Sequence, residues 1–194
     1  PEVAAAVRQA GALLAEAGYA VEEADPPDMA GAVEDWLGWA GTDMPVFMAP
    51  VMAQHGDEDA KRCFDLFAGA RPPLDRDGLM RLEARRSTRQ RAWALFLQRY
   101  PILLLPPSGE AAFPYGLDLA GKDEMERIIR AQAVSFAIPL IGVPGVSVPT
   151  GLTAAGLPMG VQIVAPRFRE DLALDAAEAI EARCPLPTPL DPRW

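Results

Sequence analysis

The chain has 194 residues, of which half are apolar and 23% are charged, a balance that supports a buried core and argues against disorder. Its formal net charge of -9 disfavours a general binder of nucleic acid or of anionic membranes, because both kinds of binding rely on clustered lysine and arginine. The apolar runs fall far short of the ~20 residues that a bilayer crossing needs, so we expect no membrane partner.

The amino-terminal region predicts a helix followed by a strand. Apolar residues recur at helical spacing over residues 1–17, and Gly18 then supplies the left-handed residue that commonly ends a helix. Residues 19–24 predict a short strand, and this order is typical of a layered α/β protein. The first helix lacks the pattern of a secretory leader, so we expect a cytoplasmic protein. Because the chain starts at Pro1 with a helix already under way, we also expect that it was cut from something longer.

Residues 28–99 predict two kinds of helical segment. The first, up to Phe67, holds short helices; the expected breaks are Gly38, Gly41, Pro45, Pro50 and Gly56, and the expected N-caps are Asp28, Asp43 and Asp57. Its many methionine and aromatic side chains form either a packed subcore or an adaptable apolar pocket, and packing is the simpler interpretation. The second is a longer helix from Asp75 or Asp77 to about Arg99, whose basic face we expect to be solvated or ion-paired.

The remainder of the chain predicts three strands and two helices. Ile102–Leu105 lies between prolines and predicts a strand that is covered on both faces. Residues 108–120 predict a loop, and a helix follows from Lys122 until Pro139 ends it. The last predicted elements are strands at Gly145–Val148 and Gly160–Ala165 with a turn region between them, a helix that starts at Glu170 and continues to Arg183, and a proline-rich surface tail at residues 185–194.

No pattern of residues within the chain indicates a catalytic mechanism. A serine or cysteine mechanism with a histidine base would depend on His55, the single histidine, which we interpret as an exposed residue at a helix end. The serines occur in neither a Gly-x-Ser-x-Gly nor a Ser-x-x-Lys motif, and the glycines fit no nucleotide-binding loop. Two cysteines and one histidine are too few for a disulfide framework or a metal centre. We therefore predict no catalytic residue, no metal and no cofactor in this chain.

A block near the carboxy terminus carries a resemblance to a known family. Its sequence is Ile141-Gly-Val-Pro-Gly-Val-Ser-Val-Pro-Thr-Gly-Leu152, followed by Gly156-Leu-Pro-Met-Gly-Val-Gln-Ile-Val-Ala165. It is similar to the late conserved block of amidase-signature enzymes, which resembles Gly-x-Pro-x-x-Ser-x-Pro-x-Gly, a short spacer and Gly-Leu-Pro-x-Gly-x-Gln. The helix that starts at Phe168-Arg-Glu170 continues the match, and residues 1–27 and 100–106 agree with the family in order.

The resemblance implies the fold class and the domain organisation. We expect an α/β protein with an α/β/α layering and a central mixed sheet, of which residues 1–194 form the carboxy-terminal part of a single amidase-signature domain. Residues 28–99 match weakly, as expected where that family builds variable helices that line the substrate. Residues 100–194 would supply the late strands of the sheet and the carboxy-terminal helix.

The resemblance also implies amide chemistry whose reactive groups lie elsewhere. The hydrolysis in that family resembles acyl transfer through a Ser nucleophile, a bridging cis Ser and a Lys base, inside an upstream segment rich in glycine and serine. This chain has no Ser-Ser pair, and its only lysines are Lys61 and Lys122, so no member of the triad can be carried over. We expect the carboxy-terminal fragment of an amidase that cleaves a carboxamide to a carboxylate and ammonia or an amine, and that is inactive alone.

The family layout places Ala133, Ala137 and Leu140 at the substrate, with helix packing as the simpler alternative. Leu140 departs from the family, which usually has an Asn near this position, and indicates a more apolar site. The expected partner is a small-molecule amide, and a homodimer stays open. Two other functions stay open as well: the amidase subunit of a glutamine-dependent amidotransferase, and a non-catalytic binding or structural domain derived from an amidase half.

Overall fold

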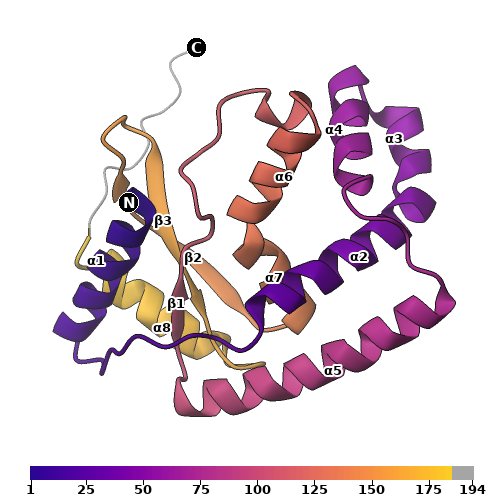
Figure 1. Ribbon diagram of the computed structural model, residues 1–194. Coiled ribbons are helices and arrows are strands. Elements are labelled where there is room, and N and C mark those ends of the chain that lie inside the picture. Colours follow the sequence, from indigo (N-terminus) through magenta and orange to yellow (C-terminus); the bar gives the residue numbers. More distant parts are fainter. Residues whose placement is uncertain (185–194) are drawn as a thin grey trace.

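The computed structural model describes residues 1–184, which form three layers (Figure 1). In chain order the elements are α1 (Glu2–Glu16), α2 (Met29–Phe47), α3 (Ala49–His55), α4 (Glu58–Ala68), α5 (Arg76–Arg99), β1 (Leu103–Leu105), the 3-10 helix η1 (Leu117–Leu119), α6 (Lys122–Ala131), α7 (Ala133–Ile141), β2 (Gly145–Leu152), β3 (Pro158–Val164) and α8 (Glu170–Glu181). Within these residues, no helix combines the length and the apolar character that a membrane span requires. The tail predicted at residues 185–194 lies outside the described residues.

The sheet contains β1, β3 and β2 in that spatial order, and both pairs of strands are antiparallel. The central strand is β3, which places Ile163 opposite Leu104 on one side and opposite Val146 on the other. The predicted α/β class is confirmed. The parallel pairs that a mixed sheet requires do not occur among the strands described here.

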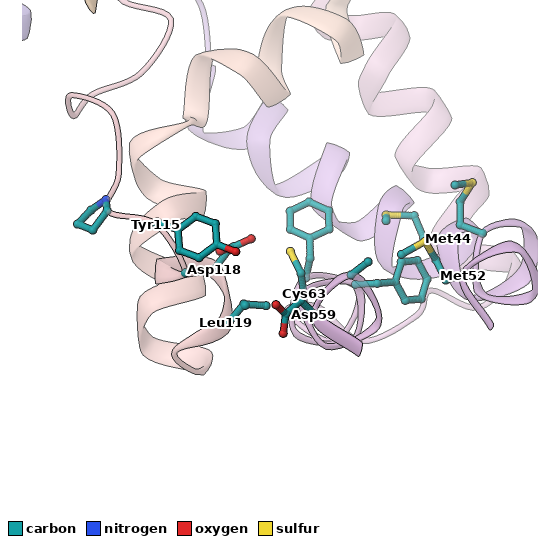
Figure 2. Close-up of a pocket in the computed structure, with 13 residues that line it drawn as sticks. Met44, Met52, Asp59, Cys63, Tyr115, Asp118 and Leu119 are labelled. Atoms are coloured by element: carbon teal, nitrogen blue, oxygen red, sulfur yellow. The ribbon is translucent and has the colours of Figure 1, made fainter. Parts of the chain in front are cut away.

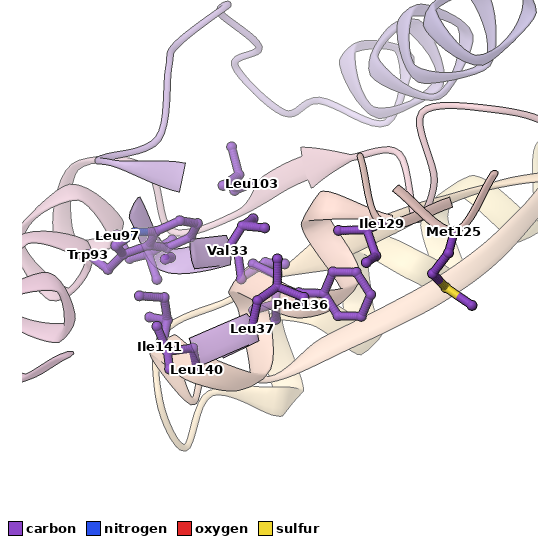
Figure 3. Close-up of a cluster of buried hydrophobic side chains, with 14 residues drawn as sticks. Val33, Leu37, Trp93, Leu97, Leu103, Met125, Ile129, Phe136, Leu140 and Ile141 are labelled. Atoms are coloured by element: carbon purple, nitrogen blue, oxygen red, sulfur yellow. The ribbon is translucent and has the colours of Figure 1, made fainter. Parts of the chain in front are cut away.

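An apolar core covers each face of the sheet, because successive side chains along a strand point to opposite faces. Ile163 packs in a cluster with α1 and α8, whereas Val164 packs in a second cluster with α2, α5, α6 and α7. Figure 3 shows the second cluster, in which Leu103 of β1 takes part. Leu104 packs against the first cluster. The predicted coverage of this strand on both faces is therefore confirmed.

The strand predicted at residues 19–24 is not formed. Helix α1 ends as predicted, with Gly18 in the left-handed region at a φ of 97°. The residues that follow have no regular secondary structure, and the Val21 side chain is 53% exposed. A strand needs a neighbour to accept and donate its backbone hydrogen bonds, and this segment has none among residues 1–184.

Helix α2 continues through positions that the sequence predicted as breaks. Gly38, Gly41 and Pro45 lie inside it, and so does Asp43, which was predicted as an N-cap. The glycines serve packing instead, because the segment between α4 and α5 crosses this helix closely. A Cβ atom on Gly41 would lie 2.7 Å from the backbone oxygen of Arg71.

We expect Gly41→Ala to destabilise the protein by about 1–3 kcal/mol, because the added methyl group meets backbone rather than a flexible side chain. Gly11 in α1 provides a matched control, since a Cβ there would meet the Val21 Cγ1 atom at 3.7 Å, an ordinary contact. Gly11→Ala also gains helix propensity, so it should be neutral or stabilising by up to about 1 kcal/mol. Urea unfolding measures both variants, and equal stabilities would contradict the close approach at α2.

Three of the helices begin at aspartate N-caps that the sequence predicted. The side chain of Asp28 accepts a hydrogen bond from the backbone N–H of the third residue after it at 3.1 Å. Asp57 and Asp75 do the same for α4 and α5, at 2.8 and 2.7 Å. Each contact satisfies an N–H group that the helix leaves without an internal partner, and so fixes where the helix starts.

The single helix predicted between Lys122 and Pro139 is two helices, α6 and α7, which meet at Gln132. The backbone N–H of Gly109 donates to the Ala131 carbonyl at 2.6 Å, so the preceding loop occupies an acceptor that a continuous helix would use internally. Pro139 was expected to end the helix but lies inside α7 with its ring exposed. The helix ends at Gly142, which has a φ of 75°.

The basic face of α5 is ion-paired in part and exposed in part, in line with the prediction of a solvated or ion-paired face. Arg85 and Arg89 both contact the buried carboxylate of Asp35 in α2, and Arg89 also reaches the α2 cap Asp28. Arg86 donates to the carbonyl of Leu140 in α7 at 3.0 Å. These arginines therefore connect α5 to the two helices that pack between it and the sheet.

Candidate functional site

A groove of about 660 Å³ lies between the α2–α4 helices and the loop that carries η1 (Figure 2). Its wall consists mainly of thioether and aromatic side chains, from Met44, Met48, Met52, Phe64 and Phe67. The volume and the apolar wall are typical of sites that bind small molecules. The groove belongs mostly to residues 28–99, for which the lining of a substrate was predicted; that role stays a prediction.

Polar side chains interrupt this apolar wall at four places. Asp59 and Cys63 come from α4, Asp118 comes from η1, and Tyr115 comes from the loop before η1. Tyr115 is fully exposed, whereas Cys63 and Asp118 are half-buried. No arginine or lysine is among the described residues that line the groove. The groove therefore offers two carboxylates as hydrogen-bond acceptors on an apolar surface.

Contacts hold the two sides of the groove to each other and to the apolar core. The Arg62 Nε–H of α4 donates to the Leu119 carbonyl at 2.7 Å, which joins η1 to α4. On the side of the core, the rings of Trp36 and Phe136 stack with their centroids 4.7 Å apart, and Phe67 packs against both. Trp36 and Phe67 thus belong to a packed subcore, while Met44, Met48 and Met52 face the groove.

The pKa of the Cys63 thiol is raised. Burial raises its pKa above the ordinary value, and its hydrogen bond to the Asp118 carboxylate, together with the negative charge of that carboxylate, raises the pKa further. At neutral pH the thiol therefore stays protonated. Cys63 and Asp118 line the same groove, from α4 and η1 respectively.

We expect iodoacetamide to alkylate Cys63 slowly at about pH 8, because the raised pKa leaves little of the reactive thiolate. Asp118→Asn should speed the reaction several-fold, since the negative charge that opposes the thiolate is removed. Mass spectrometry of the modified peptide gives the rate, with Cys184 in the same sample as an internal reference and the exposed Asp175→Asn as a matched control. A rate that does not respond to Asp118→Asn would contradict the contact.

The residues predicted to touch substrate lie on α7, away from the residues that line the groove. Ala137 and Leu140 are 0% and 1% exposed and belong to the apolar cluster between the sheet and α5. Ala133 is half-buried and packs against the edge of that cluster. Substrate contact by the three residues stays a prediction, and of the three, Ala133 offers the exposed surface through which this chain could make it.

The other side chains considered for catalysis make local contacts. Ser108 accepts a hydrogen bond from the backbone N–H of Glu110 at 3.2 Å, and Ser135 donates to the Pro107 carbonyl at 2.9 Å. His55 is exposed at the end of α3, as predicted. Within residues 1–184, no hydrogen bond joins a serine to lysine or histidine, and no three His, Cys, Asp or Glu side chains gather where they could hold a metal ion.

Three polar residues of the groove, Asp59, Cys63 and Asp118, had no role predicted from the sequence. The fold brings α4 and η1 together from positions more than fifty residues apart, and neither aspartate belongs to a motif whose spacing would indicate a site. Gln162 of β3 was also missed, and its side-chain oxygen is buried without a hydrogen-bond partner in the described part of the chain. A signal for this residue was present, because it occupies the glutamine position of the amidase-like block.

Comparisons with known proteins agree on one family. The family model described as Amidase matches residues 1–174. An indoleacetamide hydrolase of Bradyrhizobium japonicum is 36% identical over 185 residues, which cover 94% of this chain and 39% of the relative. A component of the glutamyl-tRNA(Gln) amidotransferase of Methylorubrum extorquens is 37% identical over 79 residues, which cover 41% of this chain and 16% of the relative.

Solved structures share the fold over nearly the whole chain. A 6-aminohexanoate cyclic dimer hydrolase, whose structure was determined in complex with substrate, superposes with a TM-score of 0.74 at 24% identity and covers 96% of this chain and 42% of that one. The corresponding component of the glutamyl-tRNA(Gln) amidotransferase of Thermotoga maritima superposes with a TM-score of 0.68 at 25% identity, covering 95% of this chain and 39% of that one. The chain thus spans about two-fifths of the length of the indoleacetamide hydrolase and of these two solved structures.

Proposed function

This chain belongs to the Amidase family, and we propose that it is the carboxy-terminal part of an enzyme that cleaves a carboxamide to a carboxylate and ammonia or an amine. The observation that carries this proposal is the 36% identity to an indoleacetamide hydrolase over 94% of the chain. The chain covers about two-fifths of that relative. We place the nucleophilic serine, the bridging serine and the lysine base in polypeptide outside the 194 residues.

For the substrate we propose an aromatic amide of the indole-3-acetamide type. The relatives with the longest alignments among those compared are both named indoleacetamide hydrolases, at 36% and 34% identity. The thioether and aromatic wall of the groove supports the same choice, because such walls favour flat apolar ligands. A small-molecule amide is therefore the partner we propose. The cytoplasmic location stays a prediction from the sequence, and a homodimer stays open.

The test uses a fluorophosphonate probe, which forms a covalent bond with activated serines. It is applied to the complete product of the reading frame that encodes this chain, alongside an assay of ammonia release from indole-3-acetamide. We expect hydrolysis, and we expect the labelled peptide to lie outside residues 1–194. A label on Ser87, Ser108, Ser135 or Ser147, or a complete product without amidase activity, would refute the proposal.

The amidase subunit of a glutamine-dependent amidotransferase is a second candidate. It is favoured by the matches to glutamyl-tRNA(Gln) amidotransferase components, although these cover 41% of the chain in sequence. Purification without overexpression discriminates between the two functions. An amidotransferase would copurify with other subunits and would require glutamine for transfer, whereas a free amidase would release ammonia from indole-3-acetamide alone.

A further inference from the structure

We infer that the groove between α2–α4 and η1 binds an uncharged aromatic amide through its N–H groups and rejects the corresponding carboxylate. The inference rests on the proposed function and deepens it, since it assigns the selection of substrate over acid product to this groove. Three observations carry it: the chemistry of the wall, the carboxylates within it, and the way the neighbouring cation is held.

The wall selects for a flat apolar body. Met44, Met48 and Met52 present thioethers, which make favourable contacts with aromatic rings, and Phe64 adds a ring of its own. Met48 remains 44% exposed, so a ligand that covers it removes apolar surface from water. A volume of about 660 Å³ is large enough for a bicyclic ring with a short side chain.

The polar groups of the groove select for hydrogen-bond donors. The carboxyl oxygens of Asp59 and Asp118 are hydrogen-bond acceptors, and the Cys63 thiol beside Asp118 is a weak donor. A carboxylate has more acceptor sites than one thiol occupies, so Asp118 can accept an N–H group of a ligand as well. The indole N–H and the carboxamide NH2 group are both donors of this kind.

The nearest cations in the sequence, Lys61 and Arg62, are not among the residues that line the groove. Arg62 is next to Cys63 on α4, but its Nε–H donates to the carbonyl of Leu119. Lys61 pairs with Glu58 at 3.7 Å. Among the described residues, the lining of the groove contains two carboxylates and no basic side chain, so an anion placed in it meets two negative charges at shorter range than the charge of Arg62 at its edge.

Water and a primary amide yield a carboxylate and ammonium, so the reaction turns a neutral group with two N–H donors into an anion of nearly the same shape. The groove would bind the neutral amide and repel the carboxylate product. Selection by charge therefore favours entry of the substrate and departure of the acid product.

Isothermal titration calorimetry of the 194-residue chain with indole-3-acetamide and with indole-3-acetate tests the inference. We expect the amide to bind at least about tenfold more tightly than the acid, from the repulsion of like charges at short range. Asp118→Asn and Asp59→Asn should each reduce this ratio, whereas Asp175→Asn on the exposed side of α8 should leave it unchanged. Equal affinities for the two probes, no binding of either, or a ratio that neither groove variant alters would overturn the inference.

The contribution of the wall has a matched control. Met48→Ala in the groove should weaken binding of the amide several-fold, whereas Met80→Ala on α5, where the side chain is 63% exposed, should have no effect. Circular dichroism establishes that each variant is folded. If both variants changed the affinity equally, the ligand would not lie against Met48, and binding in this groove would be contradicted.

Calorimetry separates this inference from the proposed function, because binding requires no turnover. If the complete product releases ammonia from amides but the groove does not distinguish amide from acid, the inference fails and the proposed function stands. If the groove distinguishes them but the complete product hydrolyses no amide, the proposed function fails.

Discussion

Replacing Asp35 with alanine is expected to cost about 3–5 kcal/mol of stability, because removal of one partner leaves buried charges uncompensated. The Asp35 side chain is 7% exposed and lies between Arg85 and Arg89 of α5. Arg85 donates to it at 2.6 Å and is 48% exposed, so this arginine can turn to water. Arg89 is 13% exposed and cannot turn to water in the same way, and without Asp35 its remaining partner is the exposed carboxylate of Asp28. Most of the loss should therefore come from Arg89.

Urea unfolding measures this effect, and the exposed pair between Glu110 and Arg127 supplies the control. Glu110→Ala should reduce stability far less, since ion pairs in contact with water contribute little. Asp35→Asn retains the shape of the side chain and should fall between the two. An Asp35→Ala variant as stable as Glu110→Ala would mean that the buried ion pairs do not hold α2 against α5.

Trp93→Ala is expected to destabilise the protein by about 3–5 kcal/mol through the cavity that it leaves. Trp93 is fully buried in the cluster between the sheet and α5 (Figure 3). Its indole N–H donates to the Pro27 carbonyl at 2.8 Å, which fixes the chain just before α2. The substitution removes both the packing and the partner of that carbonyl.

Two further variants separate these contributions. Trp93→Phe retains much of the ring and loses the hydrogen bond, so it should cost about 1–3 kcal/mol. Leu95 lies on the same helix and is 56% exposed, and Leu95→Ala should change stability by less than about 0.5 kcal/mol. If Trp93→Ala and Leu95→Ala lost the same stability in thermal unfolding, the burial of Trp93 in the apolar core would be contradicted.

Elements whose signal is local could be predicted from the sequence. Helix α5 begins at its aspartate cap and β1 lies between prolines, and in each case the determining residues are adjacent in the chain. The predicted helix boundaries were wrong where residues distant in the sequence determine the local structure. Gly41 lies inside a helix, where its missing side chain leaves room for the backbone at Arg71, and α6 ends where the Gly109 N–H donates to the Ala131 carbonyl. Neither partner can be identified from spacing alone.

The candidate site was predictable to a smaller extent. The methionine-rich segment was identified as a subcore or a pocket, and the structure divides it between the two roles. The carboxylate of Asp118 reaches the groove on a short 3-10 helix inside a stretch that the sequence predicts as a loop. Ala137 and Leu140 were chosen from the family layout, yet their side chains are enclosed by the core of this chain. A family pattern places residues along a fold without indicating which face of a helix they occupy.

These 194 residues are expected to position and select a substrate but not to cleave it. Ammonia release from indole-3-acetamide by the purified chain, shown to be folded by circular dichroism, tests this claim most directly. We predict no release above that of buffer, whether the substrate is aromatic or aliphatic. Sustained turnover by the chain alone would contradict the claim, because it would require a nucleophile and a base among residues to which no catalytic role is assigned.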